Sequence, residues 1–367
     1  MVTHSIKWWI VVVNKLGEKM LKHGGYAKGI IDFSVNINPC VTQALLMPYV
    51  EKAVGEIGRY PDIQGNSLVE KIAEVENVAA DHIIVGNGAS DCLYTCARAL
   101  KPQTVLIIEP TFTEYRRAFE VVGSHVLSLT IDLSDQQGII EEKLIHQIKK
   151  IKGDMVILCN PNNPTGAVYS EAFIEQIIKI QAAHKGFVLL DASFRQFEGL
   201  PTYFNEKRWN LIELMSLTKY YGIPGLRCGY LMATKSVIMA MKEVQVPWSV
   251  NGLTLEIMPW LMADMTLVQA TQEWYGAEKS KMEKALTDLS FVEPMKSHAN
   301  FICCRLSNLS GHDLNEWLLD QESPMALRTC EDFVGMGDEF IRIGLKDALS
   351  NDRLIEALIR YEEETHG

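Results

Sequence analysis

Short apolar runs recur along this chain, separated by segments with the periodicity of helices. Between the runs, the spacing of Phe173, Ile177 and Ile180 places apolar side chains on one face of a helix. Ser67–Glu70 has the pattern of a capping box, which predicts that a helix begins there. This alternation predicts an α/β fold. The runs expected to be buried strands are 83–85, 105–108, 154–159 and 186–191.

Two of these runs end at polar residues. Asp191 closes one run, and the other leads into Asn160–Gly166, whose prolines and glycine force an irregular turn. Ligands of open α/β sheets bind beyond the carboxyl ends of the strands. We therefore expect Asp191 and Asn163 to border a ligand site. A polar turn without a ligand remains the alternative for Asn160–Gly166.

A third run opens into Gly86-Asn87-Gly88-Ala89-Ser90-Asp91 before an expected helix. A glycine-rich turn at a helix N-terminus presents backbone N–H groups to an anion. The segment is not the dinucleotide-binding fingerprint, because Asp91 stands where its third glycine belongs.

The segment Ser216–Arg227 contains a lysine between two hydroxyl residues and an arginine eight positions later. Pyridoxal 5'-phosphate (PLP) requires an amine for its aldehyde, an acid at its pyridine nitrogen and a cradle for its phosphate. Lys219 could supply the amine, while Ser216, Thr218 and Arg227 could bind the phosphate. For Lys219 alone, a solvated surface loop is the alternative.

Upstream residues could supply the remaining contacts. Asp191 is placed to keep a buried pyridine nitrogen protonated, which makes the ring an electron sink. Asn163 could offer its amide to the ring oxygen. A PLP site is therefore predicted from segments far apart in the sequence.

Together these segments resemble the fold-type-I PLP enzymes, from about Met20 onward. The resemblance is closest to the branch of histidinol-phosphate aminotransferases and the L-threonine-O-3-phosphate decarboxylases of cobalamin biosynthesis. It implies a large domain with a mostly parallel central sheet and a smaller α/β domain. The length of 367 residues is enough for about two domains. The expected division is an extension at 1–19, a small domain from 20–44 and 256–367, and a large PLP-binding domain from 45–255.

The resemblance also implies a role for each cofactor-binding residue. Lys219 forms the Schiff base, Asp191 pairs with the pyridine nitrogen and Asn163 contacts the ring oxygen. Phe112 stacks on the ring, and Tyr60 reaches the phosphate of the neighbouring subunit, which implies a homodimer with shared active sites. The residues expected to hold the phosphate are Ala89, Ser90, Ser216, Thr218 and Arg227.

Residues expected to bind the substrate are His23, Asn36 and Arg328 for its phosphate and Arg342 for its carboxylate, again by resemblance. Segments 23–25, 32–39 and 245–251 resemble the decarboxylases more than the aminotransferases. A surface histidine at His23 and a structural, acid-paired arginine at Arg342 are the alternatives.

One departure from the family pattern is Asp191-Ala192-Ser193-Phe194, which lacks the usual glutamate and has no phenol at position 194. In the aminotransferases this phenol contacts the ring oxygen, so its absence agrees better with the decarboxylase-like branch.

The resemblance predicts PLP-dependent decarboxylation of L-threonine-O-3-phosphate to aminopropanol phosphate in cobalamin biosynthesis. An aminotransferase acting on histidinol phosphate, or on a related phosphorylated or amino-acid substrate, is the alternative. Both reactions use the same residues, because the bond that breaks is the one held perpendicular to the ring. A third hypothesis is a PLP-binding regulatory protein that has lost catalysis.

The net charge of −11 gives no support for binding nucleic acid or anionic membranes, which usually requires a basic patch. The apolar segment Trp8–Val13 is far shorter than a membrane span. We therefore expect a cytoplasmic enzyme. The eight cysteines lack metal-ligand spacing, so we expect reduced thiols and no metal site.

Overall fold

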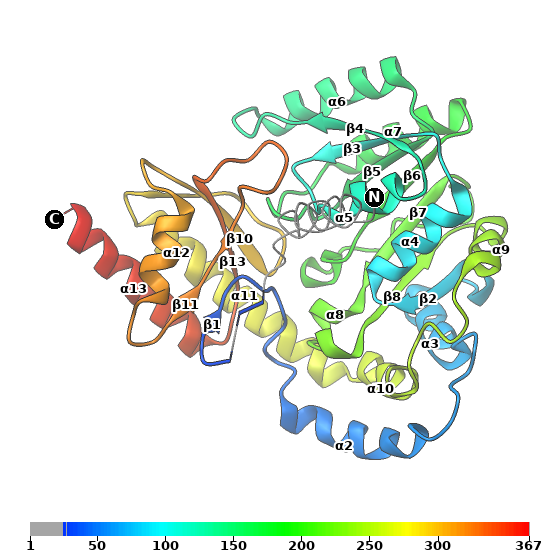
Figure 1. Cartoon of the computed structure of the whole chain (residues 1–367), viewed down its shortest axis with the longest axis horizontal. Coiled ribbons are helices and arrows are strands. Elements are labelled where there is room, and N and C mark those ends of the chain that lie inside the picture. Colours follow the sequence, from blue (N-terminus) through cyan, green and yellow to red (C-terminus); the bar gives the residue numbers. More distant parts are fainter. Residues whose placement is uncertain (1–24, 27, 367) are drawn as a thin grey trace, which may run out of the picture.

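The computed structural model of the chain describes residues 25–26 and 28–366. Its central sheet has seven strands in the order β2-β8-β7-β6-β5-β3-β4 (Figure 1). β8 runs antiparallel to the other six strands, so the predicted α/β fold with a mostly parallel sheet is confirmed. The strands are β2 (Ile83–Asn87), β3 (Thr104–Glu109), β4 (His125–Thr130), β5 (Met155–Cys159), β6 (Phe187–Asp191), β7 (Leu211–Ser216) and β8 (Cys228–Met232).

Helices cover both faces of this sheet, so its strands are apolar on both sides. Along β5, Met155 and Ile157 pack with residues of α4, α5 and α9. Val156 and Leu158 point to the opposite face and pack with residues of α6 and α7. These helices are α4 (Ala89–Leu100), α5 (Glu114–Glu120), α6 (Gln137–Ile151), α7 (Glu171–Ala183) and α9 (Lys235–Val244).

A second, antiparallel sheet with the order β12-β13-β10-β9 lies beside the first (Figure 1). Its strands are β9 (Val292–Pro294), β10 (Phe301–Leu306), β12 (Arg328–Thr329) and β13 (Phe340–Gly344). The strands β1 (Ile31–Asp32) and β11 (Met325–Ala326) form a separate parallel pair. The helices of this part are α11 (Met265–Thr287), α12 (Gly311–Leu319) and α13 (Ala348–His366).

Two further helices, α2 (Gln43–Ala53) and α10 (Gly252–Ala263), pack together near the central sheet, and α10 also packs on α3 (Asn66–Glu76). The predicted boundary between 255 and 256 falls inside α10. The division into a large and a small domain stays a prediction. The remaining helical segments are α8 (Leu217–Tyr220), η1 (Val54–Glu56), η2 (Ala80–His82), η3 (Arg195–Glu198) and η4 (Pro224–Leu226).

A helix begins at this place as predicted, but the capping box expected at Ser67–Glu70 is wrong. Helix α3 begins at Asn66, one residue after Gly65, so Ser67 lies inside its first turn. Asp62 accepts hydrogen bonds from the backbone N–H groups of Gln64 and Asn66 at 2.9 and 2.8 Å instead. This carboxylate satisfies a free N–H at the start of the helix.

The described residues 25–26 and 28–366 contain no helix long and apolar enough to span a membrane and no group of side chains suited to a metal ion. All eight cysteines have free thiols, and all except Cys40 are buried.

Arg195 forms a buried ion-pair cluster just beyond β6. Its guanidinium lies 2.5 Å from a carboxylate oxygen of Glu76 on α3 and 3.0 Å from one of Glu213 on β7. Tyr230 on β8 donates its hydroxyl to Glu76 at 2.5 Å. Burial raises the pKa of Glu213, and the charge of Arg195 opposes this effect. The cluster therefore fixes the segment that follows Asp191.

Replacing Arg195 by methionine is expected to lower the free energy of unfolding by about 3–5 kcal/mol, because two buried carboxylates lose their cation. Urea unfolding followed by circular dichroism measures this change. The control Lys235→Met removes an exposed ion pair with Asp81 and should leave the midpoint nearly unchanged. Equal midpoints for the two variants would contradict a structural role for the Arg195 cluster.

Candidate functional site

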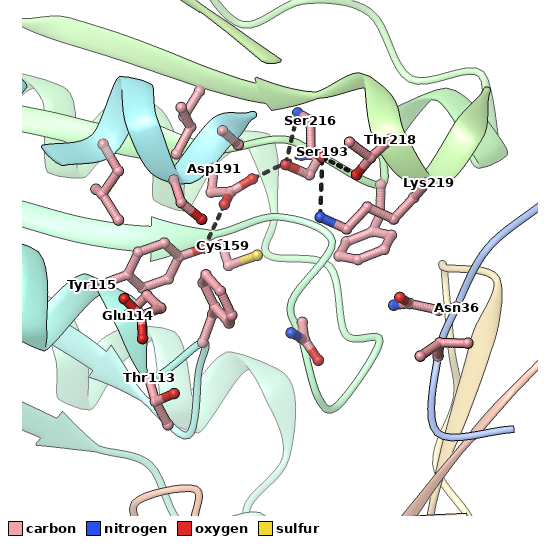
Figure 2. A pocket seen from close by; sticks show the side chains of 18 of the residues that line it. Asn36, Thr113, Glu114, Tyr115, Cys159, Asp191, Ser193, Ser216, Thr218 and Lys219 are labelled. Atoms are coloured by element: carbon pink, nitrogen blue, oxygen red, sulfur yellow. Dashed lines mark hydrogen bonds between the residues drawn. The ribbon is translucent and has the colours of Figure 1, made fainter. Parts of the chain in front are cut away.

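A cavity of about 630 Å³ lies at the carboxyl ends of β5, β6 and β7, where the second sheet approaches (Figure 2). Most of the predicted site residues meet here. Those that line the cavity are Asn36, Ala89, Ser90, Phe112, Asn163, Asp191, Ser216, Thr218, Lys219, Arg227, Arg328 and Arg342. Tyr60 does not line it, and His23 lies outside the described residues.

Both carboxylate oxygens of Asp191 are held by hydrogen bonds. Tyr115 of α5 donates its hydroxyl to Oδ2 at 2.6 Å, and the backbone N–H of Ser193 donates to Oδ1 at 2.9 Å (Figure 2). Burial, followed by the nearby charge of Asp191, raises the pKa of Tyr115 well above its usual value, so this phenol stays protonated. Sequence reasoning missed Tyr115 and Ser193, because nothing in the local pattern shows that Tyr115 reaches Asp191.

Lys219 lies in the short helix α8, directly after β7. Its Nζ donates to Ser216 Oγ at 3.0 Å, and this hydroxyl also lies 2.9 Å from Thr218 Oγ1. The backbone N–H of Ser216 donates to Ser193 Oγ, which connects this group to the Asp191 side (Figure 2). Burial lowers the pKa of Lys219, while the negative charge of Asp191 opposes the shift. A buried amine of lowered pKa is suited to react as a nucleophile.

The glycine-rich turn brings the N-terminus of α4 close to Arg227. Gly88 precedes this helix with φ +88°, and a Cβ added there would lie 2.5 Å from Arg227 Nη2. A Cβ at Gly229 on β8 would lie 2.3 Å from the backbone nitrogen of Ala89. The first N–H groups of a helix have no intrahelical acceptor. The turn, the start of the helix and the guanidinium therefore form a cradle suited to an anion.

Arg342 enters the cavity from β13. It donates through Nη1 to the side-chain oxygen of Asn163 and through Nη2 to the carbonyl oxygen of Ser34 at 2.7 Å. Burial lowers the pKa of Arg342 to about 10, which still leaves it charged at neutral pH. Within the described part of the chain its hydrogen-bonding partners are neutral and its Nε has none. The alternative of an arginine paired with a structural acid does not fit these contacts.

Arg328 lies opposite Arg342 in the pairing of β12 with β13. Its Nη2 lies 2.8 and 2.7 Å from the two carboxylate oxygens of Asp332, and Nη1 donates to the carbonyl of Thr329. The guanidinium also stacks over the ring of Phe333, 4.9 Å from its centroid. Asp332 has no counterpart among the residues predicted from the sequence.

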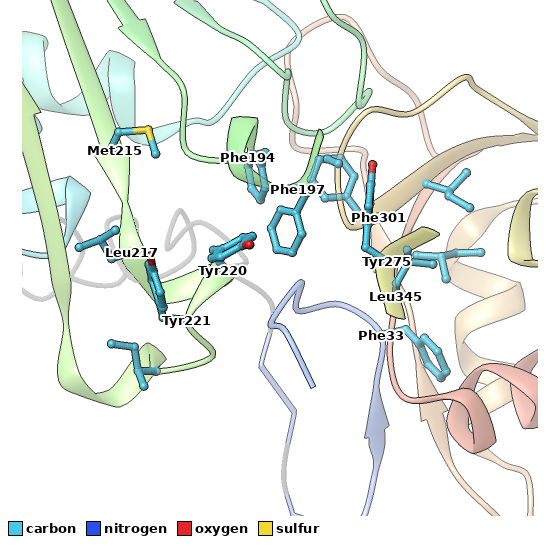
Figure 3. Close-up of a cluster of buried hydrophobic side chains, with 14 of the residues drawn as sticks. Phe33, Phe194, Phe197, Met215, Leu217, Tyr220, Tyr221, Tyr275, Phe301 and Leu345 are labelled. Atoms are coloured by element: carbon cyan, nitrogen blue, oxygen red, sulfur yellow. The ribbon is translucent and has the colours of Figure 1, made fainter. Parts of the chain in front are cut away.

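Phe194 stands where the family pattern has a phenol, and it lines the cavity. It is 4% exposed and meets Phe301 of the second sheet edge to face, with 5.0 Å between the ring centroids. In the same buried cluster, Phe197 of η3 packs on Tyr275 of α11, with 5.6 Å between the ring centroids (Figure 3). Aromatic packing thus joins the two parts of the chain next to the site.

Tyr60 lies away from the cavity and is 85% exposed. Its ring packs against Trp248, which is itself about half exposed, with 5.0 Å between the ring centroids.

Comparison with known proteins gives consistent matches. The family model "aminotransferase class I and II" matches residues 28–358. A putative threonine-phosphate decarboxylase from Caldanaerobacter subterraneus is 32% identical, over 95% of this chain and 97% of the relative. The threonine-phosphate decarboxylase of Salmonella typhimurium is 31% identical, over 90% of each chain. The crystal structure of the histidinol-phosphate aminotransferase from Clostridium acetobutylicum superposes with a TM-score of 0.83 at 27% identity, over 91% of this chain and 100% of the other.

These matches confirm the predicted family, its fold type, its enzymatic nature and PLP as its cofactor. The chain belongs to the aminotransferase class I and II family, as a PLP-dependent enzyme similar to both decarboxylases and aminotransferases.

Proposed function

We propose that this enzyme decarboxylates L-threonine-O-3-phosphate to aminopropanol phosphate, as a step of cobalamin biosynthesis. The observation that carries this proposal is the pair of buried arginines, Arg328 and Arg342, on adjacent strands facing the cavity that contains Lys219. Two guanidinium groups match a substrate with a phosphate at one end and a carboxylate at the other. The names of the two decarboxylase relatives, at 31% and 32% identity, support the same substrate.

The residues of the cavity fit PLP in their chemistry. Lys219 offers a buried amine, Asp191 a carboxylate held on both oxygens, and the cradle around Gly88 and Arg227 binds an anion without a Cβ to obstruct it. Phe112 contributes an aromatic ring to the same cavity. When bound there, PLP supplies an aldehyde for the substrate amine and a ring that accepts electrons from Cα.

The protein's part in the proposed reaction is to orient the substrate and to move one proton. Arg342 holds the carboxylate, while Arg328 and Asn36 hold the phosphate, and their positions decide which bond at Cα stands perpendicular to the ring. The lowered pKa of Lys219 suits it to exchange a proton with Cα near neutral pH. Decarboxylation requires Lys219 to donate this proton, whereas transamination requires it to accept one.

Transamination of histidinol phosphate is the second candidate, favoured by the TM-score of 0.83 to the aminotransferase structure. The same arginines and the same lysine would serve it. The predicted cytoplasmic location and the predicted absence of nucleic-acid and membrane partners stay predictions.

Purified enzyme with PLP and L-threonine-O-3-phosphate is expected to release CO2 and form aminopropanol phosphate without any keto-acid acceptor. Trapping of labelled CO2 and mass spectrometry of the product measure this reaction. Lys219→Ala should lose at least ~100-fold in rate, because it removes the group that carries the proton. Turnover of histidinol phosphate with 2-oxoglutarate, without CO2 release from the threonine derivative, would establish the second candidate instead.

Gly88→Ala is expected to raise the dissociation constant of PLP about tenfold or more, because the new methyl group displaces Arg227 from the cradle. Fluorescence titration of the apoenzyme with PLP measures this constant. Gly123→Ala is a matched control, since Gly123 has nearly the same φ, +90°, and nothing within 4 Å of its added Cβ. Both variants carry the backbone strain, so equal losses of PLP affinity would contradict the proposed cradle.

We propose further that the enzyme is a homodimer in which Tyr60 reaches the PLP phosphate of the neighbouring subunit. An exposed tyrosine packed against an exposed tryptophan, Trp248, is unusual on a monomer surface and suits an interface. Ile57 and Val246, which lie close to Tyr60 and Trp248 in the sequence, are also exposed, to 67% and 60%.

Mixing Tyr60→Ala with Lys219→Ala subunits tests this arrangement. If Tyr60 acts across the interface, a mixed dimer has one site with both substitutions and one with neither. Random exchange should then restore roughly a quarter of the native sites. Decarboxylation assays before and after subunit exchange measure the recovery. No recovery, with subunit exchange verified by mass spectrometry, would contradict the shared site.

A further inference from the structure

The two arginines of the cavity differ in whether a carboxylate pairs with the guanidinium. Both are buried, with 8% of Arg328 and 6% of Arg342 exposed, and they lie opposite each other on adjacent antiparallel strands. Side chains in such positions lie on the same side of a sheet. Among the described residues, Arg342 is held by the neutral groups of Asn163 and Ser34. Arg328 instead forms an ion pair with Asp332.

The contact of Asp332 is made on the part of Arg328 that would grip an anion. Both carboxylate oxygens lie within 2.8 Å of Nη2, and Nη1 is already used by the carbonyl of Thr329. The Asp332 side chain is 22% exposed, compared with 9% for that of Arg328, and Arg328 lines the cavity whereas Asp332 approaches it from outside the cavity lining. An incoming anion would therefore meet a guanidinium whose charge is already compensated.

We propose that Asp332 competes with the distal anionic group of the substrate for Arg328 and thereby sets how tightly a phosphorylated substrate or product is held. This proposal rests on the proposed function in assigning the substrate phosphate to Arg328. Asp332 does not take part in the chemistry at Cα, and it acts on affinity and selectivity through Arg328.

Competition between Asp332 and the phosphate would help a decarboxylase to release its product. The substrate carries a carboxylate and a phosphate, whereas the product has lost the carboxylate that Arg342 holds. The phosphate then remains as the anionic anchor of the product, at Arg328. Return of Asp332 to Arg328 favours departure of that phosphate, so the same carboxylate that weakens substrate binding speeds product release.

The electrostatic signature of this competition is its dependence on ligand charge. A fixed negative charge repels a doubly charged group about twice as strongly as a singly charged one at the same place. Removing it should therefore improve the binding of a dianion by roughly the square of the factor found for a monoanion. A purely structural role of Asp332 would not produce this ratio.

Two unreactive ligands test the proposal on the PLP-loaded enzyme. Glutarate and 4-phosphonobutyrate have the same chain length between their end groups as L-threonine-O-3-phosphate, and neither contains an amine. Isothermal titration calorimetry, at a pH at which the phosphonate is dianionic, measures their affinities for the wild type and Asp332→Asn. We expect Asp332→Asn to bind glutarate about threefold and 4-phosphonobutyrate about tenfold more tightly.

Glu331→Gln is the matched control, because it removes the same charge from the neighbouring, exposed position. It should change both affinities by less than about twofold. Weaker or unchanged binding of 4-phosphonobutyrate by Asp332→Asn would overturn the proposal and make Asp332 a residue that orients Arg328. An equal gain for both ligands would also overturn it.

The binding measurements on Asp332→Asn can be interpreted whether or not the enzyme decarboxylates L-threonine-O-3-phosphate. If the wild type releases no CO2 from L-threonine-O-3-phosphate but the charge-dependent gain is found, the proposed function fails while the competition at Arg328 stands. If CO2 is released and no gain is found, the proposed function stands while the competition at Arg328 fails. With an active enzyme, slower release of aminopropanol phosphate from Asp332→Asn in a rapid-dilution experiment would further support the role of Asp332 in product departure.

Discussion

Coverage of both faces of the central sheet is the constraint on which the site depends. Because helices pack on each side, the interior residues of β5, β6 and β7 are apolar except for Glu213, whose charge Arg195 compensates, and the other polar groups appear where these strands end. Asp191 ends β6, and Lys219 follows the end of β7 by three residues. The carboxyl ends of parallel strands meet at one edge, so the fold itself gathers the polar groups into one cavity.

Groups gathered in this way still need to be held in one orientation. The Asp191 carboxylate is fixed by a phenol from one helix and a backbone N–H from the turn that follows it. That turn leads directly into the buried ion pairs of Arg195, which connect it to α3 and β7. The rigidity of the site therefore comes from charges that lie outside it. Compared with an apolar replacement of the whole cluster, a buried arginine between two carboxylates adds little stability, but losing the arginine alone is costly, and the cluster defines one arrangement of the segment.

The sequence permitted prediction of those parts of the site that depend on local pattern. Asp191 could be placed because it closes an apolar run, Lys219 because hydroxyl residues flank it and an arginine follows eight positions later, and the anion cradle because a glycine-rich turn precedes a helix. Tyr115 could not, since its bond to Asp191 joins residues 76 positions apart. Asp332 could not be predicted either, because no local sequence pattern shows that this acidic residue pairs with Arg328. At Ser67, the local pattern misled, since Asp62 from outside the motif accepts the backbone N–H of Asn66 at the helix start.

The placement of the two arginines has a mechanical consequence. Lys219 and the anion cradle lie in segments that adjoin strands of the central sheet, whereas Arg328 and Arg342 extend from the second, antiparallel sheet. A molecule that is held at once by both sets of groups ties one sheet to the other, as a removable crosslink does. Its binding free energy then adds to the resistance of the chain to unfolding, in proportion to the logarithm of its concentration. The enzyme with bound substrate is therefore expected to resist unfolding more strongly than the same enzyme after its product has left.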